Sequence, residues 1–174
     1  MKLKLRPGRL PEELPLSHPA SLIATWFGVG LAPIAPGTWG SLAALPIAWL
    51  VVLYSGALGL FAIFVVTAVI GTWAASIVVA RGRVNDPGFI VVDEVAAMFL
   101  TLLCAPFTWW GYLLAFLLFR LADIVKPFPA NWADRHVHGG FGVMLDDLIA
   151  GLYAGIATWL LSGYVSNAVE RFGS

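Results

Sequence analysis

The chain alternates between long apolar runs and short clusters of polar residues. The longest apolar run, residues 41–80, contains no charged residue. As one straight helix it would extend for ~60 Å at ~1.5 Å per residue, which is about twice the hydrocarbon thickness of a bilayer. We therefore predict a helical hairpin with helices at 41–54 and 58–80. Its turn is expected at Tyr54–Gly59, in the sequence YSGALG.

The other apolar segments predict further helices joined by polar loops. Residues 21–35 are interrupted by glycines and prolines, which favours a short or re-entrant helix over a complete span. A second hairpin is predicted from helices at 92–104 and 109–125, followed by a last helix at 145–164. The predicted fold is all-α, a polytopic membrane helical bundle of about four to five transmembrane helices plus the broken or re-entrant N-terminal segment.

Composition supports a membrane setting. Hydrophobic residues make up 60% of the chain and charged residues 11%, with a mean hydropathy of +0.87, whereas soluble domains carry roughly 25% charged residues. The length of 174 residues allows a single membrane-embedded domain, placed at 21–165, with tails at 1–20 and 166–174. The net charge of zero predicts no nucleic acid partner. Cys104 is alone, which excludes an intramolecular disulfide and a cysteine-based zinc cluster.

Basic residues indicate how this domain is oriented. They are concentrated in the N-terminal tail, in the loop at Arg81–Arg83 and in the segment Arg120–Arg135, and the turns YSGALG and APFT have none. The positive-inside rule then places the charged loops in the cytoplasm. The N-terminal tail and the polar clusters are therefore expected on the cytoplasmic side of the membrane.

The densest polar cluster lies in residues 120–155, between apolar runs. Ionised groups near a bilayer core are costly unless they are paired, hydrated or metal-bound, so this cluster predicts a functional site. Asp93 and Glu94 begin a helix that starts at the same membrane face and are expected to converge on it. The candidate catalytic carboxylates are Asp93, Glu94, Asp123, Asp134, Asp146 and Asp147.

These acids also have structural interpretations. The pairs Asp93–Glu94 and Asp146–Asp147 are expected to open helices, where the helix dipole stabilises an acid by roughly 0.3–1 kcal/mol. That effect explains one acid per helix start but not two adjacent acids at each of two starts. Asp123 could form an i,i+3 ion pair with Arg120. Lys126 precedes a proline, which disfavours helix, and is expected to be a mobile cation in the loop.

Carboxylates interleaved with fixed cations indicate a metal-bridged phosphate ester. Mg²⁺ prefers carboxylate and water oxygens, and its coordination shell is commonly completed by oxygens of a substrate phosphate. Cationic side chains bind the remaining phosphate charge. The predicted metal ligands are Asp93, Glu94, Asp123, Asp146 and Asp147. The predicted phosphate-binding residues are Arg120, Lys126, Arg135, Thr38 and Ser41.

Two further polar segments, at 136–142 and 28–41, each have more than one interpretation. His136 and His138 form an HxH pattern that is weak evidence for zinc, and the glycines within 139–142 could approach phosphate or form a flexible connector. Thr38 or Ser41 could N-cap the helix that follows instead of contributing to a phosphate-cradling or gating turn. The nearby GVG lacks the lysine and spacing of a P-loop, so no nucleotide binding is predicted.

Three sequence blocks resemble the bacterial phosphatidylglycerophosphatase A family over roughly residues 20–165. The first is G-x-G-x-x-P-x-x-P-G-T-x-G-S at 28–41, and the second is Asp93-Glu94. The third runs from R-x-x-D-x-x-K-P-x-P at 120–129 through Asp134-Arg135 and two glycines to L-D-D-x-x-A-G at 145–151. The chain departs from the family pattern at Ala97, where glycine is common, and at Asn85, where some members have histidine.

The resemblance implies a Mg²⁺-dependent phosphatase, multi-pass in the bacterial inner membrane, with its active site facing the cytoplasm. It would hydrolyse phosphatidylglycerophosphate, a phospholipid of the bilayer, to phosphatidylglycerol and inorganic phosphate. We favour direct attack by water, while the spacing leaves a phospho-aspartyl intermediate open. The number of metal ions, the range of phosphomonoesters accepted and assembly into a homo-oligomer also stay open.

Two other classes were weighed against this function. The pattern DGxxAR followed by GxxxDxxxD, typical of CDP-alcohol phosphotransferases, is absent from the sequence. A small cation or proton transporter would also place carboxylates in a helical bundle and could use a broken helix. The acids cluster at one face rather than along a pathway, and no internal repeat is evident, so the transporter is kept as the alternative.

Overall fold

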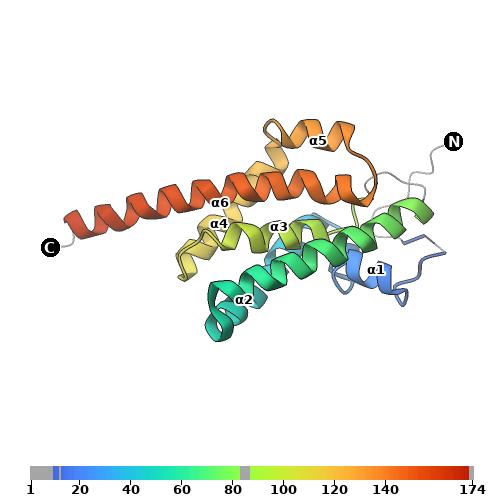
Figure 1. Ribbon diagram of the computed structural model, residues 1–174, viewed down its shortest axis with the longest axis horizontal. Coiled ribbons are helices and arrows are strands. Elements are labelled where there is room, and N and C mark those ends of the chain that lie inside the picture. Colours follow the sequence, from blue (N-terminus) through green and yellow to red (C-terminus); the bar gives the residue numbers. More distant parts are fainter. Residues whose placement is uncertain (1–9, 12, 83–86, 173–174) are drawn as a thin grey trace.

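The computed structural model of the chain is all-α, which confirms the predicted fold class (Figure 1). It describes residues 10, 11, 13–82 and 87–172, with side chains described up to residue 164. Asn85 and Arg83 lie outside the described residues. The elements are α1 Pro19–Ala24, the 3₁₀ helix η1 Val29–Leu31, α2 Pro36–Gly82, α3 Val92–Leu102, α4 Trp109–Val125, α5 Ala130–His136 and α6 Gly139–Phe172.

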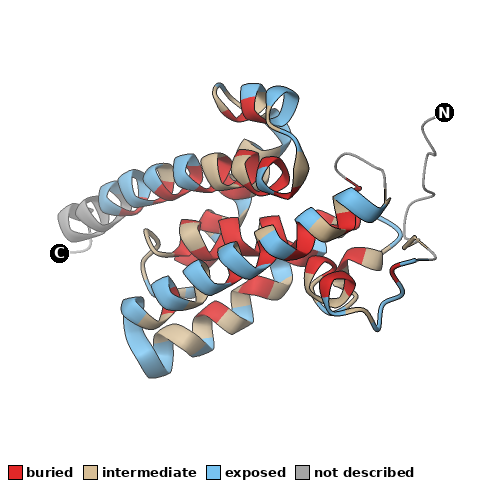
Figure 2. Cartoon of the chain, turned by 45° about the vertical axis from the view of Figure 1, so that its right-hand side comes forward, coloured by how far each residue is buried: buried red, intermediate tan, exposed pale blue. Residues whose placement is uncertain are grey.

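Helix α2 folds back on itself at Gly56, whose φ of 63° and ψ of −165° are not helical and are readily adopted by glycine. Its two halves lie side by side in both views (Figures 1 and 2). Both halves reach the start of α3, because Gly40 packs against Val91 and Gly71 against Val92. A straight helix would separate these two glycines by ~45 Å. The predicted hairpin is therefore confirmed, with its turn inside YSGALG.

The second hairpin also agrees closely with the sequence. The predicted helix at 92–104 is α3, two residues shorter at its end, and the helix predicted at 109–125 is α4. Thr108 has extended backbone, and its hydroxyl accepts a hydrogen bond from the Gly111 N–H at 3.1 Å. This N-cap satisfies a free backbone donor and fixes the start of α4.

The polar segment between α4 and the last helix is more ordered than the sequence predicted. It contains α5, which we did not predict, and α6 begins at Gly139 rather than at residue 145. Of the two interpretations of these glycines, the flexible connector is therefore wrong. Gly140 lies so close to Ser76 on α2 that a Cβ would collide with the serine backbone and hydroxyl. The glycine is a contact position between two helices.

Helix α3 lies at the centre of the bundle and contacts α2, α4 and α6. Nine of its eleven residues are buried, and the ribbon of this central helix is mostly red in Figure 2. Polar groups at its first turn are consequently enclosed by protein. The position of α3 thus sets the place where a polar site can form.

By length and composition, α2 and the stretch Gly139–Tyr164 of α6 are long and apolar enough to cross a membrane. Helix α3 has 11 residues, short of the roughly 20 needed to span a bilayer. Two long apolar helices support membrane association. The four to five transmembrane helices expected from the sequence stay a prediction.

Candidate active site

Three carboxylates from two helices meet near the start of α3. Oxygen atoms of Asp93, Glu94 and Asp147 all lie within 4.8 Å of one another. Asp93 and Asp147 are each only 5% exposed. We call these residues the carboxylate triad. Their hard oxygen donors suit a divalent cation such as Mg²⁺, and the predicted convergence of the two acidic segments is confirmed.

The start of α3 fixes two members of the triad. The N–H of Val91 donates to the carbonyl of Ala24 at 2.9 Å, which ties this helix start to the end of α1. In the first turn, the Asp93 carboxylate accepts the Glu94 N–H at 3.0 Å. The first turn of α3 thus holds both residues where their carboxylate oxygens lie within 4.8 Å of that of Asp147 on α6.

Asp146 and Asp147 do not open the last helix, and that prediction is wrong. They lie seven and eight residues after Gly139, at which α6 begins. The helix dipole acts mainly within the first turn, so it does not account for these two buried acids. The glycines 140 and 142 had suggested a loop, and their tolerance of close packing is what allows the helix to start earlier.

The absence of a side chain at Gly37 makes room for Glu94. A Cβ on Gly37 would collide with the Glu94 carboxylate and would approach a terminal nitrogen of Arg120 at 3.4 Å. The first turn of α2 therefore packs its backbone directly against the site. In the sequence this glycine stands out only as part of the 28–41 block, which does not indicate its role in close packing.

Arg120 extends the site toward α4 and α2. Its Nη1 lies 2.7 Å from the Asp123 carboxylate, so the i,i+3 pair that was the structural interpretation of Asp123 is present. The same nitrogen lies 3.4 Å from the Ser41 hydroxyl, which donates to the Gly37 carbonyl at 2.9 Å. Helix α2 begins at Pro36, before Thr38, so neither Thr38 nor Ser41 is the N-cap that the sequence suggested.

Two buried polar atoms of the site have no hydrogen-bond partner among the described residues. They are Oε2 of Glu94 and Nε of Arg120. A buried polar atom without a partner is costly, commonly by about 1–3 kcal/mol, and a bound ion or substrate can supply the missing partner. The acceptor suits a cation and the donor suits an anion. The residues present therefore fit a metal with a phosphate group beside it.

Lys126 holds two further acids together. It ends α4 with a positive φ of 45°, and its ammonium donates to Asp134 at 2.8 Å and to Asp146 at 2.5 Å. Burial lowers the pKa of Lys126, but these two hydrogen bonds and the charges of Asp146 and Asp147 outweigh burial and raise the pKa above its ordinary value. The expected mobile cation is instead a fixed one, which links α4, α5 and α6.

Residues 22–162 match the sequence profile of the family described as Phosphatidylglycerophosphatase A. The chain belongs to this family. It is 42% identical over 141 residues to Phosphatidylglycerophosphatase A of Escherichia coli (strain K12), covering 80% of this chain and 81% of that protein. It is 38% identical over 154 residues to Phosphatidylglycerophosphatase A of Haemophilus influenzae (strain ATCC 51907 / DSM 11121 / KW20 / Rd), covering 86% and 93%. No solved structure matches the chain significantly.

The departure from the family pattern at Ala97 lies in the contact between α3 and α6. A Cβ on Gly151 would approach the Ala97 Cβ at 3.2 Å and its carbonyl oxygen at 2.7 Å. The Thr101 hydroxyl donates to the Gly151 carbonyl at 3.0 Å across the same contact. The methyl group of Ala97 is therefore accommodated by a glycine on α6, and the two helices that carry the triad remain close.

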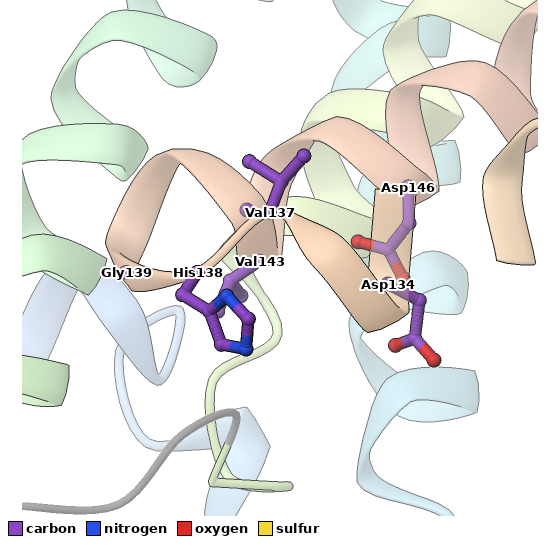
Figure 3. A pocket seen from close by; sticks show the side chains of 7 residues that line it. Asp134, Val137, His138, Gly139, Val143 and Asp146 are labelled. Atoms are coloured by element: carbon purple, nitrogen blue, oxygen red, sulfur yellow. The ribbon is translucent and has the colours of Figure 1, made fainter. Parts of the chain in front are cut away.

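The remaining predicted residues lie at the margin of the site. Arg135 is exposed on α5, and within the described part of the chain no ion pair joins it to the triad. His136 is exposed, stacks on Trp132 and contacts its carbonyl. Neither His136 nor His138 belongs to the triad, the one group of described residues suited to a metal. His138 lines a pocket of about 40 Å³ with Asp134 and Asp146 (Figure 3).

Proposed function

We propose that this protein removes the terminal phosphate of phosphatidylglycerophosphate, giving phosphatidylglycerol and inorganic phosphate. Two curated relatives carry the name of that activity over at least 80% of this chain. The observation that carries the proposal is the carboxylate triad beside Arg120, with an acceptor and a donor left unpaired. Metal-assisted hydrolysis of a phosphomonoester needs both kinds of group.

Asp93, Glu94 and Asp147 would hold Mg²⁺, with Asp123 and Asp146 as the further candidate ligands. The donor set consists of carboxylate oxygens, which suit Mg²⁺ better than they suit softer metals. The unpaired Oε2 of Glu94 would find its partner there. When bound, the ion supplies electrostatic stabilisation of the phosphoryl oxygens.

Arg120 would bind the phosphate through its unpaired Nε while Asp123 holds the other side of the guanidinium. Ser41 and Thr38 on α2 are the neutral candidates for phosphate binding, and Arg135 is an exposed cation that would meet an approaching headgroup. Lys126 would neutralise charge on the side of α5 and α6.

A carboxylate outside the triad would orient the attacking water. Asp146, held by Lys126, is one candidate, and Asp123, held by Arg120, is the other. Asp134 contacts Lys126 from the exposed side and would act by positioning this lysine. We favour direct attack by water over a phospho-aspartyl intermediate, and trapping of a phosphorylated aspartate after acid quench would overturn that preference.

A lipid substrate explains why such a site lies inside an apolar bundle. The acyl chains would stay in the leaflet while the terminal phosphate reaches the triad. We place the protein in the bacterial inner membrane as a multi-pass domain at 21–165, with the site facing the cytoplasm. This orientation rests on the basic residues in the N-terminal tail, the loop at Arg81–Arg83 and the segment Arg120–Arg135.

The test is phosphate release from phosphatidylglycerophosphate by the detergent-purified protein, with Mg²⁺ and with excess chelator. Asp147→Asn removes one triad carboxylate and should reduce turnover by about 10²-fold or more. Glu13→Gln, which changes an exposed acid in the N-terminal segment, is the matched control and should behave like the wild type. Absence of release from folded wild-type protein would favour the small cation or proton transporter instead.

A further inference from the structure

An apolar groove of about 310 Å³ lies on the outside of the bundle between α4 and α6. Its volume is at the lower end of the roughly 300–1,000 Å³ typical of ligand sites. Leu121 and Val125 are exposed and form its α4 wall, and Tyr153 forms part of its α6 wall. Ala154 and Ala157, which are less exposed, form its base. Small side chains between large ones thus leave a channel.

The groove has a polar end beside the candidate active site. Helix α4 ends at Val125, and Lys126, which follows directly, contacts Asp146 on α6. Tyr153 lies two turns after Asp146 on α6, and its hydroxyl donates to the Phe128 carbonyl at 3.0 Å. A tyrosine with an apolar ring and a hydrogen-bonded hydroxyl is typical of a boundary between apolar and polar surroundings.

The other end of the groove is entirely apolar. Leu118 lies seven residues before Val125, which is ~10 Å along the α4 axis. Ala157 lies one turn after Tyr153 on α6 and marks the same distant end. The groove therefore begins beside the polar residues Lys126 and Asp146 and runs from there into wholly apolar surroundings.

We propose that this groove binds one acyl chain of the phospholipid substrate. The inference rests on the proposed function, since the chain in question belongs to the lipid whose phosphate reaches the triad. An α-helix about 10 Å wide, rising ~1.5 Å per residue, occupies ~120 Å³ per residue, so the groove is too small to enclose a partner helix. An acyl chain attached to an anionic headgroup matches both the apolar lining of the groove and its position beside Lys126.

Filling the distant end tests this binding. Ala157→Phe places a ring in the groove, and Ile156→Phe, at an exposed neighbour that does not line it, is the matched control. Each variant is assayed with dipalmitoyl and with dihexanoyl phosphatidylglycerophosphate at a fixed mole fraction in detergent. We expect Ala157→Phe to lower kcat/KM about tenfold for the long-chain substrate and to leave the short-chain substrate unchanged. Ile156→Phe should match the wild type on both.

Equal kinetics of the two variants on the long-chain substrate would overturn the proposal. The groove would then contact only the lipids that surround the protein. A changed oligomeric mass in Ala157→Phe with unchanged long-chain kinetics would also overturn it, because the groove would then join two copies of the chain. A wild type that releases no phosphate from either substrate would instead refute the proposed function.

A second variant decides the matter if Ala157→Phe does not fold or loses both substrates. Leu121→Ala combined with Val125→Ala shortens the exposed α4 wall of the groove without placing a larger side chain in it. A KM raised for the long-chain substrate alone would support the proposal. An unchanged KM for that substrate would overturn it.

Discussion

The carboxylate of Glu94 lies in the space that a side chain at Gly37 would occupy. This contact joins the first turn of α2 to the first turn of α3. A methyl group at Gly37 would have to displace Glu94 from its neighbours Asp93 and Asp147. The precision of the site therefore depends on a residue with no functional group.

Gly37→Ala should reduce phosphate release while leaving the protein folded. A misplacement of about 1 Å at a catalytic group can cost about 10²-fold in rate, and we expect a loss of that order in kcat/KM. Gly163→Ala, where a Cβ would meet nothing within 4 Å, is the control. Full activity of Gly37→Ala would show that Glu94 does not need its present position.

Arg120→Lys should lower kcat by a larger factor than it changes KM. The substitution keeps the charge but removes the planar fork of donors, including the Nε that is unpaired among the described residues. We expect a loss of about 10²–10³-fold in kcat, the size found for removal of a transition-state donor. Steady-state kinetics would be compared with Arg81→Lys, an exposed arginine at the end of α2. A change confined to KM would mean that Arg120 serves only to bind the ground state.

Glu94→Gln should weaken metal binding directly. Replacing an anionic ligand by a neutral one lowers affinity for a hard divalent cation, and we expect the Mg²⁺ concentration for half-maximal activity to rise about tenfold or more. Binding of Mn²⁺ followed by electron paramagnetic resonance gives a readout independent of turnover. Unchanged Mn²⁺ affinity in Glu94→Gln would remove this residue from the metal site.

Lys126→Met should destabilise the contact between α4, α5 and α6. The substitution leaves Asp134 and Asp146 without their shared ammonium, and we expect a loss of about 1–3 kcal/mol in the free energy of unfolding. Because folding raises the pKa of Lys126 above its ordinary value of 10.5, its stabilisation is fully present below that pH and is lost only above it. Chemical denaturation of wild type and variant at neutral pH and at about pH 9 should therefore give the same difference. A difference that shrinks by pH 9 would contradict the raised pKa.

The sequence predicted the elements whose boundaries are set by local signals. The charge-free run fixed the hairpin, because no single helix of that length fits a bilayer, and the start of α4 follows from Thr108 as N-cap. The pair Asp93–Glu94 was placed correctly at a helix start because it lies between the polar loop that ends at Gly88 and the apolar run that begins at Val95. The ion pair of Arg120 with Asp123 followed from their spacing.

Apart from the convergence of the two acidic segments, features that depend on contacts between distant segments were missed. Glycines at 139–142 predict a loop by local propensity, yet Gly140 is required where α6 packs against Ser76, so tertiary packing overrides propensity. The same error placed Asp146 at a helix start instead of beside Lys126. A lysine before proline had suggested mobility, and its two acidic partners became apparent only once α5 and α6 were positioned.

The carboxylate triad has a consequence for the biogenesis of the protein. Asp93 and Glu94 emerge from the ribosome more than fifty residues before Asp147, and the chain between them includes α4 and α5. A nascent chain in which α6 has not yet packed against α3 brings together only two of the three carboxylates. The proposed metal site is therefore complete only once the last helix packs against α3.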